Sequence, residues 1–379
     1  MGVPEFVQPP LPRIDPAGYK RALRERRASY DPRFGSGVWR LLELLPAFSP
    51  ADVVTLGEGN LPLYPSRPGA RYAGVDALAY LHLGMNPTGS FKDLGMTVAI
   101  TAAKAAGARG VVCASTGNTA SSMAAYAARA GIEAYALIPR GGVSNAKLLQ
   151  TRDYGARIVE VEGSFDDAFA RLAGVEGDLA IVNSINPYRL EGQKCAAFAL
   201  LEAREWSVPD WVVMPGGNLG NASAIGKGFR EALALGLIDR LPRLAVVQAA
   251  GAAPFAQLWQ SGGELVPVVA RTSASAIAVG SPKSWQKALR EVRESEGFVL
   301  AVDDDAIDDA KAAIGAEGIG CEPASAASLA GLRALRASGI IAPGADAVAV
   351  LTGHVLKDVD AIARIAARSD GEAGRALSR

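Results

Sequence analysis

The loop before residue 93 places a lysine where a side-chain amine can take part in chemistry. Lys92 follows the segment NPTGSF, residues 86–91, and a helix is expected over 93–106. An ammonium near the positive end of a helix dipole is disfavoured, so the pKa of Lys92 should fall. An unprotonated amine forms Schiff bases with carbonyl compounds. Taken alone, the loop also fits a solvated lysine in the first turn of a helix.

A second polar loop lies between a predicted strand at 111–113 and a predicted helix at 120–130. Its residues, Ser115 to Thr119, supply hydroxyl groups and the side-chain amide of Asn118. Such groups either cap the helix or bind an anionic ligand at its N-terminus. The loop holds more polar residues than capping requires, which favours a ligand.

A third loop, PGGNLGN at 215–221, follows a predicted strand that ends at Met214 and precedes a predicted helix at 222–235. Glycines in such a turn let backbone N–H groups converge on a phosphate. The loop matches neither GxGxxG nor GxxxxGK[ST], which argues against a dinucleotide or ATP. We therefore expect it to hold a single phosphate.

A fourth loop, LTGHVLKD at 351–358, closes the last predicted strand. The hydroxyl of Thr352 can meet a ring nitrogen, although a turn that satisfies its own backbone is an equal alternative. The combination of the four loops is more specific than any one of them. A Schiff-base lysine, a loop for one phosphate, an amide at a strand end and a terminal hydroxyl describe a pocket for pyridoxal 5'-phosphate.

Composition limits the partners. The chain has 39 Lys and Arg residues against 39 Asp and Glu, so no net field draws it to nucleic acid or to a membrane, and a small-molecule partner is expected. Two histidines and three widely separated cysteines exclude an all-histidine metal cage and a CxxC zinc site, so no metal site is expected. The N-terminus does not read as a signal peptide, and no apolar stretch of roughly 18 residues occurs, which predicts a cytoplasmic protein.

Short apolar runs alternate with Ala-rich helical stretches from about residue 110 onward. This alternation predicts an α/β fold with parallel strands, and a chain of 379 residues is expected to form two domains. Ligands of such folds lie beyond the carboxyl ends of the strands, where the four loops are. Residues 1–34 are expected to form a flexible arm with a solvated basic helix. The predicted strands are 111–113, 134–138, 157–161, 180–182, 211–214, 244–247 and 348–351.

These loops belong to a set of segments that resembles the threonine synthase family, in the tryptophan-synthase-β-like group of pyridoxal-phosphate enzymes. The matching segments span about residues 38–360, in the family's order: GVWRLLELLP, TLGEGNLPL, NPTGSFKD, CASTGNT, NSINPYRLEGQK, GGNLGN, GIGCEPASAASLAGL and LTGHVLKD. The resemblance implies fold type II, in which two domains each have a mostly parallel sheet flanked by helices and the cofactor lies in the cleft. It implies an N-terminal arm at 1–37, a large cofactor domain at 38–96 and 190–365, a small mobile domain at 97–189 and a C-terminal tail at 366–379.

By the same resemblance, Lys92 is the catalytic residue and holds pyridoxal phosphate as a Schiff base. The other implied cofactor contacts are Asn118 at the ring 3-oxygen, Thr352 at the pyridine nitrogen, and Gly217, Asn218, Leu219, Gly220 and Asn221 at the phosphate. The implied substrate-binding residues are Ser115, Thr116, Thr119, Asn183, Ser184 and Arg189. A pairing of Arg189 with Glu191 or another carboxylate is the structural alternative for that arginine. The implied reaction converts O-phosphohomoserine and water to L-threonine and phosphate, in a homodimer.

Five residues around the expected site depart from those that the family usually has, and they bear on substrate identity. Leu61 replaces Thr, Leu94 replaces Arg, Gly320 replaces Phe, Val355 replaces Gly and Val359 replaces Pro. Valine at 355 would be strained if that loop needs a positive φ.

Other functions on this scaffold stay open as alternatives. They are a cysteate-synthase-like β-replacement, a threonine or serine dehydratase, and a catalytically silent two-lobe binding protein. Arg189 and the asparagines of GGNLGN argue against a dehydratase, and the intact Lys92 argues against a silent protein.

Overall fold

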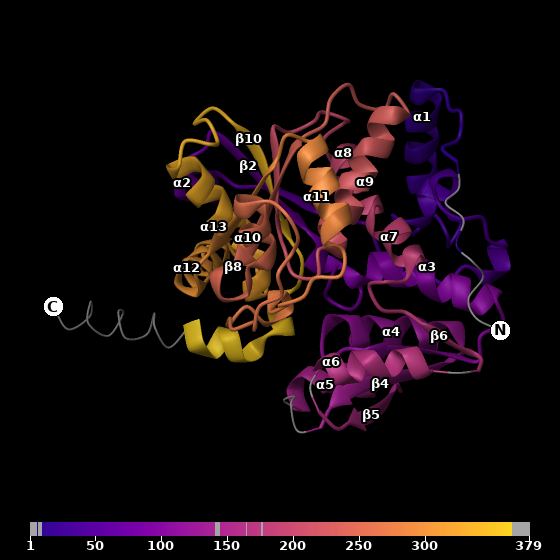
Figure 1. Cartoon of the computed structure of the whole chain (residues 1–379). Helices are drawn as coiled ribbons and strands as arrows, with labels where there is room; N and C mark the ends of the chain where they lie inside the picture. Colours follow the sequence, from indigo (N-terminus) through magenta and orange to yellow (C-terminus); the bar gives the residue numbers. More distant parts are fainter. Residues whose placement is uncertain (1–5, 7–9, 141–144, 164, 176, 366–379) are drawn as a thin grey trace.

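The larger part of the molecule is built on a six-stranded sheet in the order β1-β2-β10-β7-β8-β9 (Figure 1). The computed structural model describes residue 6 and residues 10–140, 145–163, 165–175 and 177–365. Neighbouring strands of this sheet are parallel except for β1, which pairs antiparallel with β2. The strands are β1 (Leu63–Pro65), β2 (Ala77–His82), β7 (Trp211–Pro215), β8 (Arg243–Ala249), β9 (Phe298–Val302) and β10 (Asp346–Leu351).

Both faces of this sheet are buried, because helices cover both. Along β7, Val212 and Met214 join the core on one face, whereas Trp211 and Val213 join the core on the other, as the period of two in a pleated strand requires. The first face is covered by α9 (Gly220–Ala234), α10 (Pro254–Ser261) and α11 (Trp285–Glu294). The second is covered by α2 (Arg67–Ala73), α12 (Asp304–Gly315) and α13 (Pro323–Ala337).

A smaller, fully parallel sheet in the order β5-β4-β3-β6 forms the lower part of Figure 1. Its central strand β3 is buried along its whole length, with one face on α6 and the other on the main core. The strands are β3 (Gly110–Ala114), β4 (Glu133–Pro139), β5 (Arg157–Val161) and β6 (Leu179–Ile181), and the helices are α4 (Asn118–Ala130), α5 (Asn145–Asp153) and α6 (Phe165–Ala170).

Helices α3 (Lys92–Ala105), α7 (Pro187–Gln193) and α8 (Cys195–Ala203) lie between the two sheets in sequence and help to join them in space. Two glycines bring α3 and α7 into backbone contact. A Cβ atom on Gly95 would lie 2.7 Å from the carbonyl oxygen of Arg189, and one on Gly192 would overlap the carbonyl oxygen of Leu94. The beginning of α3 is therefore fixed beside the middle of α7.

The strands predicted from the sequence are confirmed, with β6 beginning and ending one residue earlier than expected. Strands β1, β2 and β9 were not predicted. The expectation of a flexible arm with a solvated helix is wrong for α1 (Pro16–Arg27), because Tyr19 and Leu23 are buried and Arg26 bonds Glu43. The basic residues around these two positions masked an apolar pair at the i, i+4 spacing of a docked helix.

Short 3-10 turns connect several of these elements. They are η1 (Trp39–Leu44), η2 (Pro50–Asp52), η3 (Leu83–Met85), η4 (Arg171–Gly174), η5 (Ala250–Ala252), η6 (Ser275–Ile277) and η7 (Val355–Lys357).

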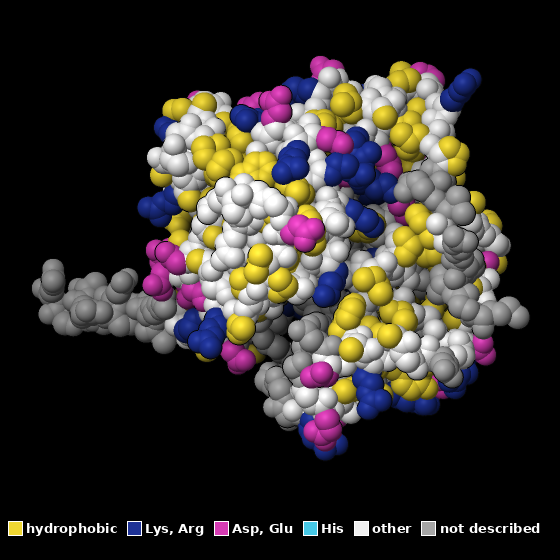
Figure 2. Space-filling view, in the orientation of Figure 1, with side chains coloured by type: hydrophobic (Ala, Val, Ile, Leu, Met, Phe, Trp, Pro, Cys, Tyr) yellow, Lys and Arg dark blue, Asp and Glu magenta, His cyan; other side chains and the backbone are white. Residues whose placement is uncertain are grey.

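On the face shown in Figure 2, Lys and Arg side chains lie among Asp, Glu and apolar side chains. None of the helices formed by the described residues is both long enough and apolar enough to cross a bilayer.

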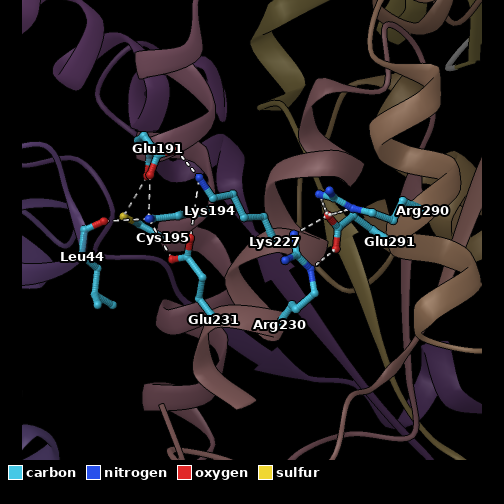
Figure 3. Close-up of polar contacts among 9 residues, drawn as sticks. All are labelled: Leu44, Glu191, Lys194, Cys195, Lys227, Arg230, Glu231, Arg290 and Glu291. Atoms are coloured by element: carbon cyan, nitrogen blue, oxygen red, sulfur yellow. Dashed lines mark hydrogen bonds and ion pairs between the residues drawn. The ribbon is translucent and has the colours of Figure 1, made fainter. Parts of the chain in front are cut away.

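A buried cluster of charges joins α7, α8 and α9 (Figure 3). The ammonium of Lys194 lies 2.7 Å from Glu191 Oε2 and 2.8 Å from Glu231 Oε2, and it donates to the carbonyl oxygen of Leu44 over 2.6 Å. Lys227 pairs with the other oxygen of Glu191. Two cations and two carboxylates balance, so the cluster holds α7 in place without net charge.

Replacing Lys194 with methionine is expected to reduce the free energy of unfolding by about 3–5 kcal/mol, because Glu191 and Glu231 would keep buried negative charges facing Lys227 alone. Chemical denaturation measures the loss. The control is Arg109→Met, since the Arg109 side chain in its ion pair with Glu133 is 61% exposed. That change should cost about 1 kcal/mol or less. Equal losses in the two variants would contradict a structural role for the buried cluster.

Candidate active site

The polar loops singled out in the sequence lie at the carboxyl ends of parallel strands of both sheets, as predicted. The four loops follow β2, β3, β7 and β10, and the segment with Asn183, Ser184 and Arg189 follows β6. Loops from different strands touch: Asn218 Nδ2 donates to Ser184 Oγ over 2.6 Å, and the Phe91 N–H donates to the Thr352 carbonyl over 3.0 Å. The structure thus brings together segments that lie far apart in the sequence.

Lys92 is the first residue of α3, one position earlier than expected. Its side chain is partly buried, and Nζ lies 4.1 Å from the centroid of the Phe91 ring. Burial lowers the pKa of Lys92 to about 7, the charge of Arg189 lowers it as well, and the carboxylate of Glu322 opposes both. The direction agrees with the expectation, and the largest cause is desolvation, followed by a neighbouring cation.

The glycine-rich loop has unpaired polar groups that suit a phosphate-bearing ligand. Leu219, at the N-terminal boundary of α9, has a φ of 63°, and the helix that follows leaves its first N–H groups without helical partners. A Cβ atom on Gly217 would lie 3.1 Å from the Cα atom of Ile277, so a larger residue would fill the turn. Asn221 is 6% exposed, and neither polar atom of its side chain has a protein partner. These features fit pyridoxal 5'-phosphate.

Asn118 and Thr352 are each held by a residue at the beginning of α13, and the sequence analysis singled out neither of these two residues. Asn118 Nδ2 donates to the two carboxylate oxygens of Glu322 over 3.3 and 3.1 Å. The Thr352 hydroxyl lies 3.2 Å from that of Ser325. A signal for Glu322 was present, because glutamate is not among the favoured residues at the N-cap position that precedes a helix.

Arg189 is 2% exposed and lies on α7. Its guanidinium donates to the carbonyl of Val182 over 3.2 Å, its Nε has no partner, and burial lowers its pKa to about 10. Pairing with Glu191 does not occur, because that carboxylate bonds Lys194 and Lys227 (Figure 3). Among the residues that the structure describes, no carboxylate forms an ion pair with Arg189.

The remaining candidate substrate residues differ in what they contact. Asn183 exchanges two hydrogen bonds with the backbone of Ala114, each of 3.0 Å, so its amide links the ends of β3 and β6. Ser115 Oγ accepts from the Gly117 N–H over 3.3 Å. Thr116 and Thr119 are partly exposed, in the same loop and in the first turn of α4, and within the described part of the chain no hydrogen bond joins them to Arg189.

The departures from the family pattern differ in burial and in what they contact. Leu94 is fully buried in the core, and Leu61 packs against the same core. A Cβ atom on Gly320 would lie 2.7 Å from Val355 Cγ1, so the valine occupies the space that a larger residue at 320 would need. The concern about strain at Val355 is unfounded, because its φ is not positive. Val359 is 46% exposed.

Comparisons with known proteins agree with this arrangement. Residues 54–353 match the family described as pyridoxal-phosphate dependent enzyme. The chain is 44% identical to a threonine synthase of Methanocaldococcus jannaschii over 86% of this chain and 82% of the relative. It is 47% identical to one of Synechocystis over 83% and 81%, and 45% identical to one of Mycobacterium tuberculosis over 83% and 87%.

Solved structures with the same fold are more distant in sequence. They include tomato threonine deaminase isoform 2, with a TM-score of 0.68, 20% identity and coverage of 96% of this chain and 98% of that one. Maize serine racemase also has a TM-score of 0.68, with 21% identity and coverage of 93% and 98%. The architecture is that of fold type II enzymes, and the chain belongs to the pyridoxal-phosphate-dependent enzymes and, within them, to the threonine synthase family.

Proposed function

We propose that this protein is a threonine synthase that converts O-phosphohomoserine and water to L-threonine and phosphate. Identity of 42–47% with threonine synthases supports this activity. The observation that carries it is Arg189, a buried cation without a carboxylate partner among the described residues, close enough to Lys92 to lower its pKa. A buried charge needs a counterion, and the phosphate of the substrate supplies one.

In this proposal the cofactor is held by groups from four loops. The N–H groups of residues 217–221 and the free amide of Asn221 bind its phosphate, Lys92 binds its aldehyde carbon, and Asn118 and Thr352 contact its ring. When bound, pyridoxal phosphate supplies an electron sink that stabilises negative charge on the carbon next to the amino group.

Lys92 moves the protons. Because the pKa of its amine is about 7, both the protonated and the free form are populated at neutral pH. A group with such a pKa is suited to accept a proton from the α carbon and to exchange protons at the β carbon of the substrate. Burial, and in second place the charge of Arg189, keeps the amine from being permanently protonated.

Arg189 binds the leaving phosphate, since a guanidinium can donate to two phosphate oxygens at once. Ser115, Thr116, Thr119 and Ser184 add hydroxyl donors around it, and Asn183 contributes the amide hydrogen that Ala114 does not use. Burial around Arg189 strengthens these bonds, because little water competes for them.

The wider assignments remain part of this proposal. The large cofactor domain comprises 38–96 and 190–365, and the small domain, 97–189, closes over the substrate to exclude water. The N-terminal arm is 1–37, and the tail at 366–379 lies outside the described residues. We propose a cytoplasmic homodimer.

The substrate assignment is tested by product analysis with O-phosphohomoserine, O-phosphoserine and threonine offered in parallel. We expect phosphate and threonine in equal amounts from the first substrate, and little turnover of the other two. Phosphate release from O-phosphoserine would favour a β-replacement enzyme, and ammonia from threonine would favour a dehydratase.

Changing Lys92 to alanine should abolish turnover and the visible absorbance of the bound cofactor, while the far-UV circular dichroism stays that of the folded protein. The reason is that the amine is the group that bonds the cofactor. Lys104→Ala is a matched control at the other end of α3, where Nζ donates to the Ala51 carbonyl. An active Lys92→Ala protein with normal absorbance would remove the central residue of the proposal.

Changing Arg189 to leucine should lower kcat/KM for O-phosphohomoserine. The expected loss of transition-state stabilisation is about 2–4 kcal/mol, the scale for removing a charged hydrogen-bond partner. The melting temperature should hold or rise, because no ion pair is lost. Arg189→Lys should recover part of the rate, since it keeps the charge but loses the fork geometry. Arg129→Leu, at the exposed end of α4, is the control. A large drop in melting temperature with kcat/KM unchanged would make Arg189 structural.

A further inference from the structure

The carboxylate of Glu322 is buried at the beginning of α13 without serving that helix. Glu322 is 4% exposed and occupies the position that precedes the first turn, yet its side chain accepts no bond from the helix N–H groups. Both of its oxygens accept from Asn118 Nδ2, at the first residue of α4. Because a buried carboxylate needs donors, its placement is explained by Asn118 rather than by capping.

The backbone around Thr352 is shaped to hold this carboxylate. The Glu322 N–H donates to the carbonyl of Gly353 over 3.0 Å, and a Cβ atom on Gly353 would overlap the carboxylate. Ser325, one turn into α13, accepts from the Gly353 N–H over 2.9 Å and contacts the Thr352 hydroxyl. The beginning of α13 and the loop after β10 are therefore one hydrogen-bonded unit.

The same unit reaches α4 at a second point. Lys357, in η7, donates to Ser121 Oγ over 3.0 Å, to the Thr88 carbonyl over 3.2 Å and to Gln150 Oε1 over 2.5 Å. Ser121 lies one turn after Asn118 on α4. A carboxylate and an ammonium from the large-sheet side thus hold the first turn of α4, which belongs to the small-sheet part in Figure 1.

We propose that Glu322 is a positioning residue that aims the side-chain amide of Asn118 at the ring oxygen of the cofactor. The inference rests on the proposed contact between Asn118 and that oxygen. A carboxylate accepts hydrogen bonds but donates none, so it fixes which end of the amide faces it. One hydrogen of Nδ2 goes to Glu322, and the second is left for the ring oxygen. An amide released from Glu322 can rotate and present its oxygen, which an anionic ring oxygen repels.

Glu322→Asp separates positioning from stability. Aspartate is a favoured residue at a helix N-terminus, so α13 should be held at least as well as in the wild type. Its side chain is one methylene shorter and should not reach Asn118. We expect the dissociation constant for added pyridoxal phosphate to rise about 10- to 100-fold, the range for losing a hydrogen bond to a charged group. The absorbance of the bound cofactor should shift, with the melting temperature of the cofactor-free protein unchanged or raised.

A double-mutant cycle with Asn118→Ala tests whether Glu322 affects cofactor binding through Asn118. Because Glu322 acts through Asn118, the double variant should bind pyridoxal phosphate no more weakly than Asn118→Ala alone. The control is Glu317→Ala, which removes a carboxylate that bonds Ser66 and Tyr80 away from the site. That variant should lose stability while its cofactor dissociation constant stays unchanged.

Wild-type cofactor affinity and absorbance in Glu322→Asp would overturn the inference, and so would additive losses in the double variant. The titration uses pyridoxal phosphate and no substrate, so its outcome is independent of the substrate assignment. If the protein turns over O-phosphohomoserine but the effects of Glu322 and Asn118 on cofactor affinity are additive, the inference fails and the proposed function stands. If the effects of Glu322 and Asn118 are coupled but O-phosphohomoserine is not turned over, the proposed substrate fails and the inference stands.

Discussion

A partly buried lysine and a fully buried arginine, on two helices in backbone contact, determine the electrostatics of the site. Burial lowers the pKa of Lys92 to about 7 and the charge of Arg189 contributes in the same direction, while burial lowers the pKa of Arg189 to about 10. A fold that holds such a pair must fix both backbones, because separation by a few ångströms would relieve the repulsion. The two cations then leave a place where a negatively charged ligand is stabilised.

The backbones are fixed by close packing and by a neutral charge cluster. Gly95 and Gly192 let α3 and α7 approach without intervening side chains, which places Lys92 and Arg189 on adjoining helices. The cluster around Lys194 secures α7 from its other side and occupies the carboxylate of Glu191. The carboxylates of Glu191 on α7 and Glu231 on α9 pair with lysines and stabilise the fold. The guanidinium of Arg189 therefore stays available for a ligand.

The loops were predictable from the sequence because each one combines glycine, amide and hydroxyl residues directly after an apolar run. Strand β2 was missed, since the run ALAYLH has little β-branched character and does not separate strand from helix. The docking of α1 was missed because Tyr19 and Leu23 stand among basic residues.

The contacts inside the site depend on tertiary packing that a linear pattern does not contain. Whether Glu191 pairs with Arg189 or with Lys194 and Lys227 depends on where α9 packs. Asn118 and Glu322 are 204 residues apart in the sequence, and only the meeting of α4 with α13 brings them together. The positions of Thr352 and the glycine-rich loop follow from predicted strand ends, whereas the partners of these residues do not.

The pKa of Lys92 in the cofactor-free protein tests the central claim most directly. Lysine labelled with ¹³C next to the amine, titrated by NMR in the wild type and in Arg189→Leu, reports it, with Lys92→Ala assigning the signal. The account predicts a pKa of about 7 in the wild type and a higher pKa once the cation at 189 is removed. A pKa near 10.5, the ordinary value for lysine, in both proteins would contradict it.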